Sequence, residues 1–89
     1  MLIRELESVN LNHIGCTQVT YANKNYYVST AKISSISTYY ETEIFPCDEY
    51  GNVMDWSEIY RKTYKNEDEA LNNHKYICEH LVEILEEGN

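Results

Sequence analysis

The chain has 89 residues, with fifteen acidic and seven basic side chains and a net charge of −8. A chain of this length forms one domain, residues 1–89, and buries only about 60 to 65% of the surface that its unfolded form exposes. The negative charge argues against direct binding to a nucleic-acid backbone and favours a partner protein with a basic surface. No apolar run reaches the roughly 20 residues that span a bilayer, and no signal-peptide core follows Met1, so we expect a cytoplasmic protein without a membrane partner.

The first third of the chain predicts one helix and two strands. Residues 2–9 favour a short helix, because their apolar side chains recur at roughly helical spacing. β-branched and aromatic residues predict strands at 16–22 and 26–33. The asparagine-rich segment 23–25 between them predicts a tight turn.

A third strand is predicted at 38–45, after a polar connection at 34–37. Its residues alternate, so that Glu41 and Glu43 point to one face and the neighbouring residues to the other. We expect Pro46 to end this strand, because proline cannot donate to a sheet ladder.

The next stretch has two interpretations. Residues 48–52 have the composition of a hairpin loop, which favours a returning strand at 58–64. Trp56, Tyr60 and Tyr64 also fall at helical spacing. The upstream turn and the aromatic residues favour the strand.

Residues 66–87 form the one segment that is long and periodic enough to be a helix. Asn66 and Glu69 have the spacing of a capping box, and Gly88 supplies the stop. The apolar stripe, which must face the sheet, consists of Ala70, Leu71, His74, Ile77, Cys78, Leu81, Val82 and Leu85. The outward face is acidic and consists of Tyr76, Glu79, His80, Glu83, Glu86 and Glu87.

These elements predict an α+β domain, in which a four-stranded antiparallel meander carries the C-terminal helix across one face, with a possible short helix at the N-terminus. The sequence leaves the oligomeric state open.

Metal binding and catalysis find little support. Cys16, Cys47 and Cys78 are odd in number and lack paired spacing, so we expect reduced thiols. His74 and Cys78, one helical turn apart, could hold a metal ion with Cys16, Cys47 or His13, but two polar residues on a buried stripe are more often core. We therefore expect no metal site and no cofactor, and a structural His74 bonded to a backbone carbonyl or a tyrosine hydroxyl.

Glu41 and Glu43 could act as paired carboxylates in acid and base catalysis, although a solvated strand face explains them equally well. The chain contains no nucleophile elbow, phosphate-binding glycine loop or histidine-rich metalloenzyme motif. We therefore do not expect an enzyme.

Several motifs occur in an order that resembles a family of small uncharacterised bacteriophage proteins. The family pattern reads V-S-T, then Y/F-E-T-M-V-F, a turn, R-Y-x-T, and E-E-A-x-x-G-H in the final helix. The matching segments here, spread over residues 26–80, are Val28-Ser29-Thr30, Tyr40-Glu41-Thr42-Glu43-Ile44-Phe45, Trp56-Ser57-Glu58, Arg61-Lys62-Thr63-Tyr64 and Glu67-Asp68-Glu69-Ala70-Leu71-Asn72-Asn73-His74.

The chain departs from this pattern in three places. Asn73 replaces a glycine, Glu43 replaces a methionine, and the connection at 34–37 is shorter than the glycine- and proline-rich loop of many members. The resemblance implies a phage or prophage origin without an established chemistry. Small phage proteins of this kind are often host-takeover or anti-defence factors, including anti-CRISPR-like ones.

We therefore expect a small acidic protein that binds and inhibits a host protein, such as a nucleic-acid-binding enzyme of a defence system. The alternative is a structural or regulatory phage accessory module without an inhibitory role, and a metal-dependent enzyme comes third. The residues expected to bind the partner are aromatic or acidic, on the outward helix face or on the open sheet face: Tyr76, Glu79, Glu83, Glu86, Glu87, Glu41, Glu43 and Trp56.

Overall fold

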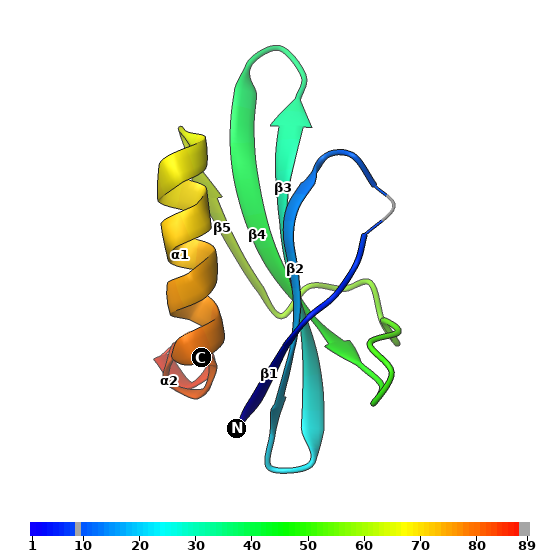
Figure 1. The fold of residues 1–89 in the computed structure, drawn as a ribbon. Helices are drawn as coiled ribbons and strands as arrows, with labels where there is room; N and C mark the ends of the chain where they lie inside the picture. The colour runs from blue at the N-terminus through cyan, green and yellow to red at the C-terminus, as the bar shows by residue number, and fades with distance from the viewer. Residues whose placement is uncertain (9, 88–89) are drawn as a thin grey trace.

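One antiparallel sheet and a layer of two helices make up the protein, which is described here by a computed structural model covering residues 1–8 and 10–87. The strands pair in chain order (Figure 1). The elements are β1 (Leu2–Glu5), β2 (His13–Tyr21), β3 (Lys24–Ser34), β4 (Thr38–Cys47), β5 (Tyr60–Tyr64), α1 (Glu67–Glu79) and α2 (Leu81–Glu87). The predicted α+β meander is confirmed, but the sheet has five strands rather than four and the helical layer has two helices rather than one.

The additional strand is β1, which lies where a short helix was expected. It pairs with β2 through Ile3 opposite Val19 and Glu5 opposite Thr17. The helical spacing of residues 2–9 was misleading, because so short a helix gains little by itself whereas the exposed edge of β2 offers backbone partners. Val9, the last residue of the predicted helix, lies outside the described residues.

The hairpin between β2 and β3 turns one residue earlier than predicted. Ala22 and Asn23 have φ values of 50° and 64°, as the two central residues of a type I′ turn require. Lys24, expected in the turn, is already paired with Tyr21. The asparagine signal was correct, but an alanine in the left-handed region was not foreseeable from composition.

Pro46 does not end β4, which continues to Cys47 with Pro46 opposite Tyr26 of β3. The carbonyl of Pro46 accepts a hydrogen bond from the amide of Met54, at 3.1 Å, on the side away from β3. The amide and carbonyl of a strand residue point to the same side, so the missing N–H of Pro46 removes no bond to β3. The proline is therefore tolerated inside the strand.

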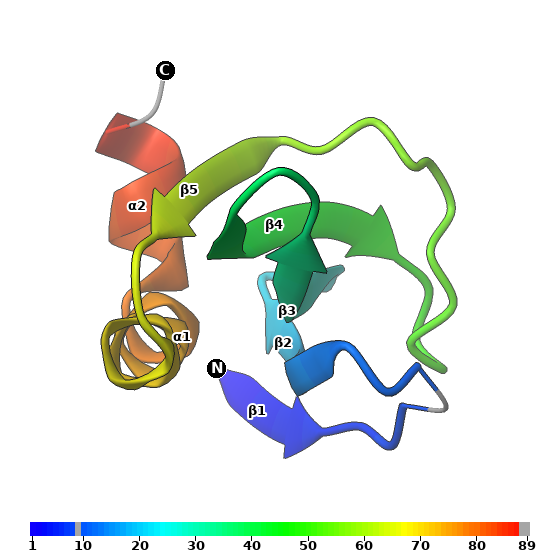
Figure 2. The same ribbon diagram turned by 90° about the horizontal axis from the view of Figure 1, so that it is seen from above.

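The helical layer packs on the concave side of the curved sheet (Figure 2). Asn66 caps α1 as predicted, because its side chain accepts a hydrogen bond from the Glu69 amide at 2.8 Å. Gly88, the expected stop, lies outside the described residues. Sheet and helices share a core that consists of Val19, Val28, Ile44, Ile77, Cys78 and Leu81. Leu71 does not join this core and is 41% exposed, so the predicted stripe is only partly buried.

The predicted single helix is bent at His80. The backbone there has φ −122° and ψ 27°, and both the amide and the ring Nδ1 of His80 lie within 3.0 Å of the Tyr76 carbonyl. Figure 2 looks along α1, with α2 running across the view. The bend allows Ile84 and Leu85 to pack against the core cluster beside Tyr60 and Tyr26.

His74 lies between α1 and the sheet in a row of hydroxyl groups, defined here as the inner polar row. Its Nε2 lies 2.9 Å from the Thr17 Oγ1 and its Nδ1 lies 2.7 Å from the Thr30 Oγ1, which is 2.6 Å from the Thr42 Oγ1. Its structural position agrees with expectation, but its partners are threonines rather than a carbonyl or a tyrosine. Close by, the Tyr64 hydroxyl is buried near Thr42 without a hydrogen bond of normal geometry.

Candidate functional site

The sheet has an inner face, under the helices, and an outer face on the opposite side. Thr42 and Ile44 of β4 are fully buried on the inner face, and strand alternation places Glu41, Glu43 and Phe45 on the outer face. The predicted alternation of this strand is therefore confirmed. The connection from β4 to β5 lies on the side of the sheet away from the helices (Figure 1).

Three carboxylates on the outer face converge on one guanidinium. Arg61 of β5 lies opposite Glu43 in the sheet register. Its nitrogen atoms lie 3.8 Å from Glu41, 3.6 Å from Glu43 and 2.7 Å from Glu58. We call these four residues the carboxylate cluster. The roles of Arg61 and Glu58 were not predicted from the sequence, because only the pairing register of β4 and β5 brings them beside Glu43.

Glu43 is the most perturbed acid of this cluster. Burial, followed by hydrogen bonding and repulsion from Glu41, raises the pKa of Glu43 to about 7, although Arg61 opposes the shift. A carboxyl group with this pKa is about half protonated at neutral pH. Protonation of Glu43 reduces the repulsion between its carboxyl group and the neighbouring carboxylate of Glu41 beside Arg61.

Aromatic rings continue the outer face next to the carboxylate cluster. Phe45 follows Glu43 by two residues on the same strand face, and the Trp56 ring meets it edge-on with centroids 5.2 Å apart. Tyr27 of β3, which lies opposite Phe45 in the sheet register, has its ring centroid 6.4 Å from that of Phe45. Phe45 is buried, whereas Trp56 is 71% exposed. The Trp56 ring therefore packs against Phe45 while most of the Trp56 surface is exposed to solvent.

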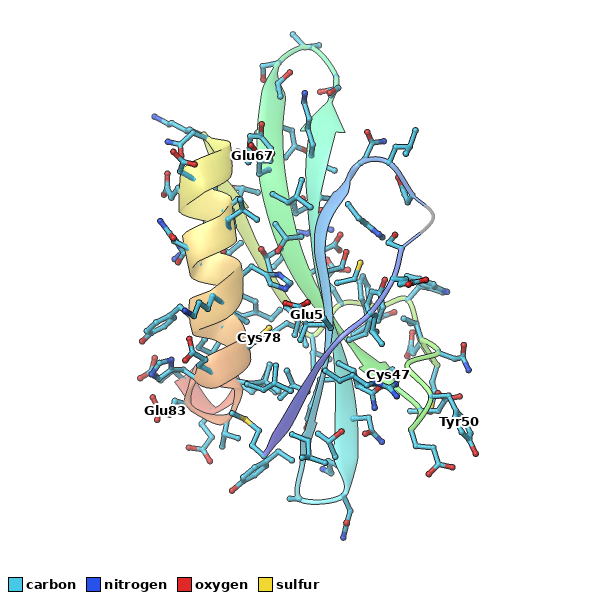
Figure 3. All side chains as sticks on the ribbon, viewed as in Figure 1. Glu5, Cys47, Tyr50, Glu67, Cys78 and Glu83 are labelled. Carbon is cyan, nitrogen blue, oxygen red and sulfur yellow. The ribbon has the colours of Figure 1, made fainter. Side chains whose placement is uncertain are left out.

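The β4–β5 connection, residues 48–59, exposes further large apolar side chains. Tyr50 is 73% exposed, Met54 66% and Ile59 48%. Figure 3 shows Tyr50 pointing outward, on the opposite side of the molecule from Glu83 of α2. The same connection contains four acidic residues and no lysine or arginine. We call the connection together with the carboxylate cluster and Phe45 the outer acidic surface.

The connection begins with the predicted hairpin loop at 48–52, across which Cys47 pairs antiparallel with Val53 and the Asp48 amide donates to the Asn52 carbonyl at 2.9 Å. The carboxylate of Asp48 accepts hydrogen bonds from the amides of Tyr50 and Asn52, both at 2.9 Å, and from the Asn52 side chain at 3.2 Å. These bonds, above all the one from the Asn52 backbone, lower the pKa of Asp48. Gly51 has φ +85°, which suits glycine. Asp48 is therefore a fixed negative charge beside Tyr50.

The structure divides the predicted binding residues between two sides of the molecule. Glu41, Glu43 and Trp56 come together on the outer face. The predicted helix residues lie on the other side of the molecule. They do not form one stripe, because the bend at His80 separates α1 from α2: Tyr76 and Glu79 are on α1, and the remaining acids are on α2, namely Glu83, Glu86 and Glu87. Tyr76 stacks on the His80 ring at 4.2 Å and is half exposed.

The residues considered for a metal shell also lie on opposite faces of the sheet. His13 and Cys16 contact each other on the outer face, whereas His74 and Cys78 lie under α1. Figure 3 shows Cys78 between α1 and the sheet, with Cys47 on the other side. Among residues 1–8 and 10–87, no three His, Cys, Asp or Glu side chains form a group that could hold a metal ion.

The fold is that of a small α+β protein, with the outer acidic surface on the side of the sheet away from the helices. No protein-family model matches the chain, and neither a curated protein nor a solved structure is significantly similar to it. Neither helix in the described part of the chain has the length and apolar character that crossing a membrane requires.

Proposed function

We propose that this protein binds a basic surface of another protein through its outer acidic surface. The observation that carries the proposal is the β4–β5 connection, in which Tyr50, Met54, Trp56 and Ile59 are largely exposed among acidic residues. Single exposed apolar side chains are common, but several within one connection next to carboxylates are typical of protein-binding surfaces. Trp56, held at its base by Phe45, is the main anchor.

The carboxylate cluster supplies the charge for such a partner. One guanidinium faces three carboxylates, so negative charge is left over for lysine or arginine side chains of the partner. A depression of about 760 Å³, lined among others by Glu41, Arg61 and Lys65, adjoins the cluster at the edge of β5 and offers room for a projecting side chain. Acidic groups at the rim mainly accelerate association, while the aromatic anchors slow dissociation.

The partner we propose is a host protein that the phage-type protein inhibits by occupying its basic site. The resemblance to small bacteriophage proteins supports this part, together with the net charge of −8. A nucleic-acid-binding enzyme of a defence system has a basic site built for phosphates, and an acidic protein competes for such a site by charge. Inhibition follows from occlusion and needs no chemistry from the bound protein.

The test is an affinity capture from bacterial host lysate with matched variants. Trp56→Ala removes the anchor on the outer face, and Tyr76→Ala makes the corresponding change on the helical side. We expect one partner that the parent protein and Tyr76→Ala retain in stoichiometric amount, that Trp56→Ala loses, and that high salt releases. The purified partner must then lose its own activity when the parent protein is added.

Other outcomes contradict the proposal in distinct ways. Capture that survives Trp56→Ala but fails with Tyr76→Ala would move the binding surface to the helices. A captured partner whose activity is unchanged would favour the alternative of a structural or regulatory accessory module, as would the absence of any stoichiometric partner.

A further inference from the structure

A bulge in β2 turns His13 toward the outer face of the sheet. The pairing of β2 with β3 shifts between His13 and Gly15, which leaves Ile14 as the extra residue. Gly15 belongs to the inner face, where a Cβ atom would lie 3.0 Å from Nε2 of His74. In a regular strand His13 would share that face, because alternate residues point the same way. The bulge reverses its direction, as bulges beside functional groups often do.

On the outer face His13 meets the thiol of Cys16. Its Nδ1 lies 3.2 Å from the Cys16 Sγ and 2.5 Å from the Ser8 Oγ, and its Nε2 lies 3.2 Å from the Ser29 Oγ. The Tyr27 hydroxyl donates to the same sulfur at 3.3 Å. These contacts are consistent with one tautomer of His13, in which Nε2–H donates to Ser29 and the lone pair of Nδ1 faces both the Ser8 hydroxyl and the Cys16 thiol, while Tyr27 donates to the sulfur.

This arrangement contains the parts of an activated thiol. An imidazole at hydrogen-bond distance can accept the thiol proton, and a hydroxyl donor aimed at the sulfur stabilises the thiolate. Burial lowers the pKa of His13, which keeps its ring neutral and able to accept a proton at neutral pH. The phenol of Tyr27 stays protonated, because burial and the neighbouring thiols raise its pKa.

Neither of the other two cysteines contacts an imidazole in the described part of the chain, although the Thr17 hydroxyl lies close to the Cys78 thiol, so they serve as internal controls. Cys47 and Cys78 are buried like Cys16, with 2% and 3% of their surfaces exposed against 6%. Burial raises the pKa of the Cys47 thiol, and it raises the pKa of the Cys78 thiol to about 11. Exposure therefore separates the three thiols only slightly, whereas the imidazole contact of Cys16 distinguishes it from the other two described cysteines.

We propose that Cys16 and His13 form a thiol–imidazole pair that makes Cys16 the reactive thiol of this protein and a site of covalent modification by small carbon electrophiles. The thiol proton passes to Nδ1 of His13, and the sulfur electron pair forms a bond to the electrophilic carbon. The bond from that carbon to its leaving group breaks, and the leaving group departs with the electron pair. His13 then releases the proton to water, which restores the neutral imidazole.

The test uses iodoacetamide, in which iodide is the leaving group, with the native full-length protein. Mass spectrometry of peptides gives the labelling rate of each cysteine. We expect Cys16 to react before Cys47 and Cys78, and His13→Gln to slow its labelling by roughly tenfold or more. His80→Gln, which removes a histidine at the corner of the two helices, is the matched control and should leave the rate unchanged.

The pH profile distinguishes a base from a merely structural histidine. With His13 as the base, the labelling rate of the parent protein levels off as the imidazole loses its proton, whereas His13→Gln follows the steady rise of an ordinary buried thiol. Tyr27→Phe keeps the ring and removes the donor to sulfur, so it should also slow labelling and serves as a second variant if His13→Gln does not fold. Equal rates for the three cysteines in the parent protein, or parent-like Cys16 rates and pH profiles in the folded variants, would overturn the proposal.

Discussion

Leu81→Ala is expected to destabilise the domain by about 3 to 5 kcal/mol, near the upper end of the range for truncating a buried leucine. Leu81 is fully buried at the start of α2 and contacts the core that both helices and the sheet share. Its truncation removes apolar burial and leaves a cavity where side chains of the sheet and of both helices meet. Natural domains have about 0.05 to 0.15 kcal/mol per residue, or about 4 to 13 kcal/mol for this chain, so the loss is a large share of the total.

Leu71→Ala provides the matched control, because it is the same substitution on a helix of the same layer. Leu71 is 41% exposed, and its truncation should cost less than about 1 kcal/mol. Both variants change helix propensity by the same small amount, so the difference between them measures burial. Urea unfolding gives the free energies, and similar slopes against urea show that both variants unfold from the same structure. A loss below about half a kcal/mol for Leu81→Ala, or equal losses in the two variants, would refute the assignment of the core.

Three further predictions concern titration and the cysteines. Because burial raises the pKa of Glu43 from its ordinary 4.5 to about 7, the folded state holds a proton that the unfolded chain releases, so the free energy of unfolding should fall as pH rises through this range. Urea melts at a series of pH values should show this fall in the parent protein and not in Glu43→Gln; identical slopes would contradict it. Burial lowers the pKa of His74 below 6.5, with Glu5 opposing, so only the unfolded chain gains a proton as pH drops through that value. In the Glu43→Gln background, stability should therefore decrease as pH falls below about 6.5, and a flat profile would show that His74 is not held neutral. All three cysteines are free thiols in the structure, so a thiol titration of the unfolded protein should count three without reductant, and EDTA should leave the melting temperature unchanged; a count of one, or a lower melting temperature, would contradict this.

Local patterns in the sequence were sufficient for the features that depend on neighbouring residues. The alternation around Glu41 and Glu43 gave the correct faces of β4, and Asn66 marked the start of α1, because strand pleat and helix capping are set within a few residues. The buried positions Ala70, Ile77 and Leu81 followed from helical spacing.

The features that were missed depend on distant parts of the chain. Residues 2–9 carry a helical spacing, and only the free edge of β2 converts Leu2–Glu5 into a strand. The bulge at Ile14 and the bend at His80 leave no mark in hydrophobic periodicity, so neither the outward turn of His13 nor the separation of Tyr76 from the acids of α2 could be predicted. Arg61 joins Glu41 and Glu43 only through the register of β4 and β5.

The inner polar row fixes the position of α1 along the sheet. The ring of His74 reaches the Thr17 and Thr30 hydroxyls in the observed alignment, and a shift of α1 by one turn would break both bonds. Thr30 would keep its bond to Thr42, but the His74 ring and the Thr17 hydroxyl would lose these partners. Each unsatisfied group costs about 1 to 3 kcal/mol, so two such groups would cost about 2 to 6 kcal/mol, a substantial share of the stability of so small a domain. Gly15 adds a steric limit, because the ring of His74 fits against it only where no side chain projects. A few polar contacts therefore hold the helical layer in one alignment on the sheet, although the core between the two layers is made of apolar side chains.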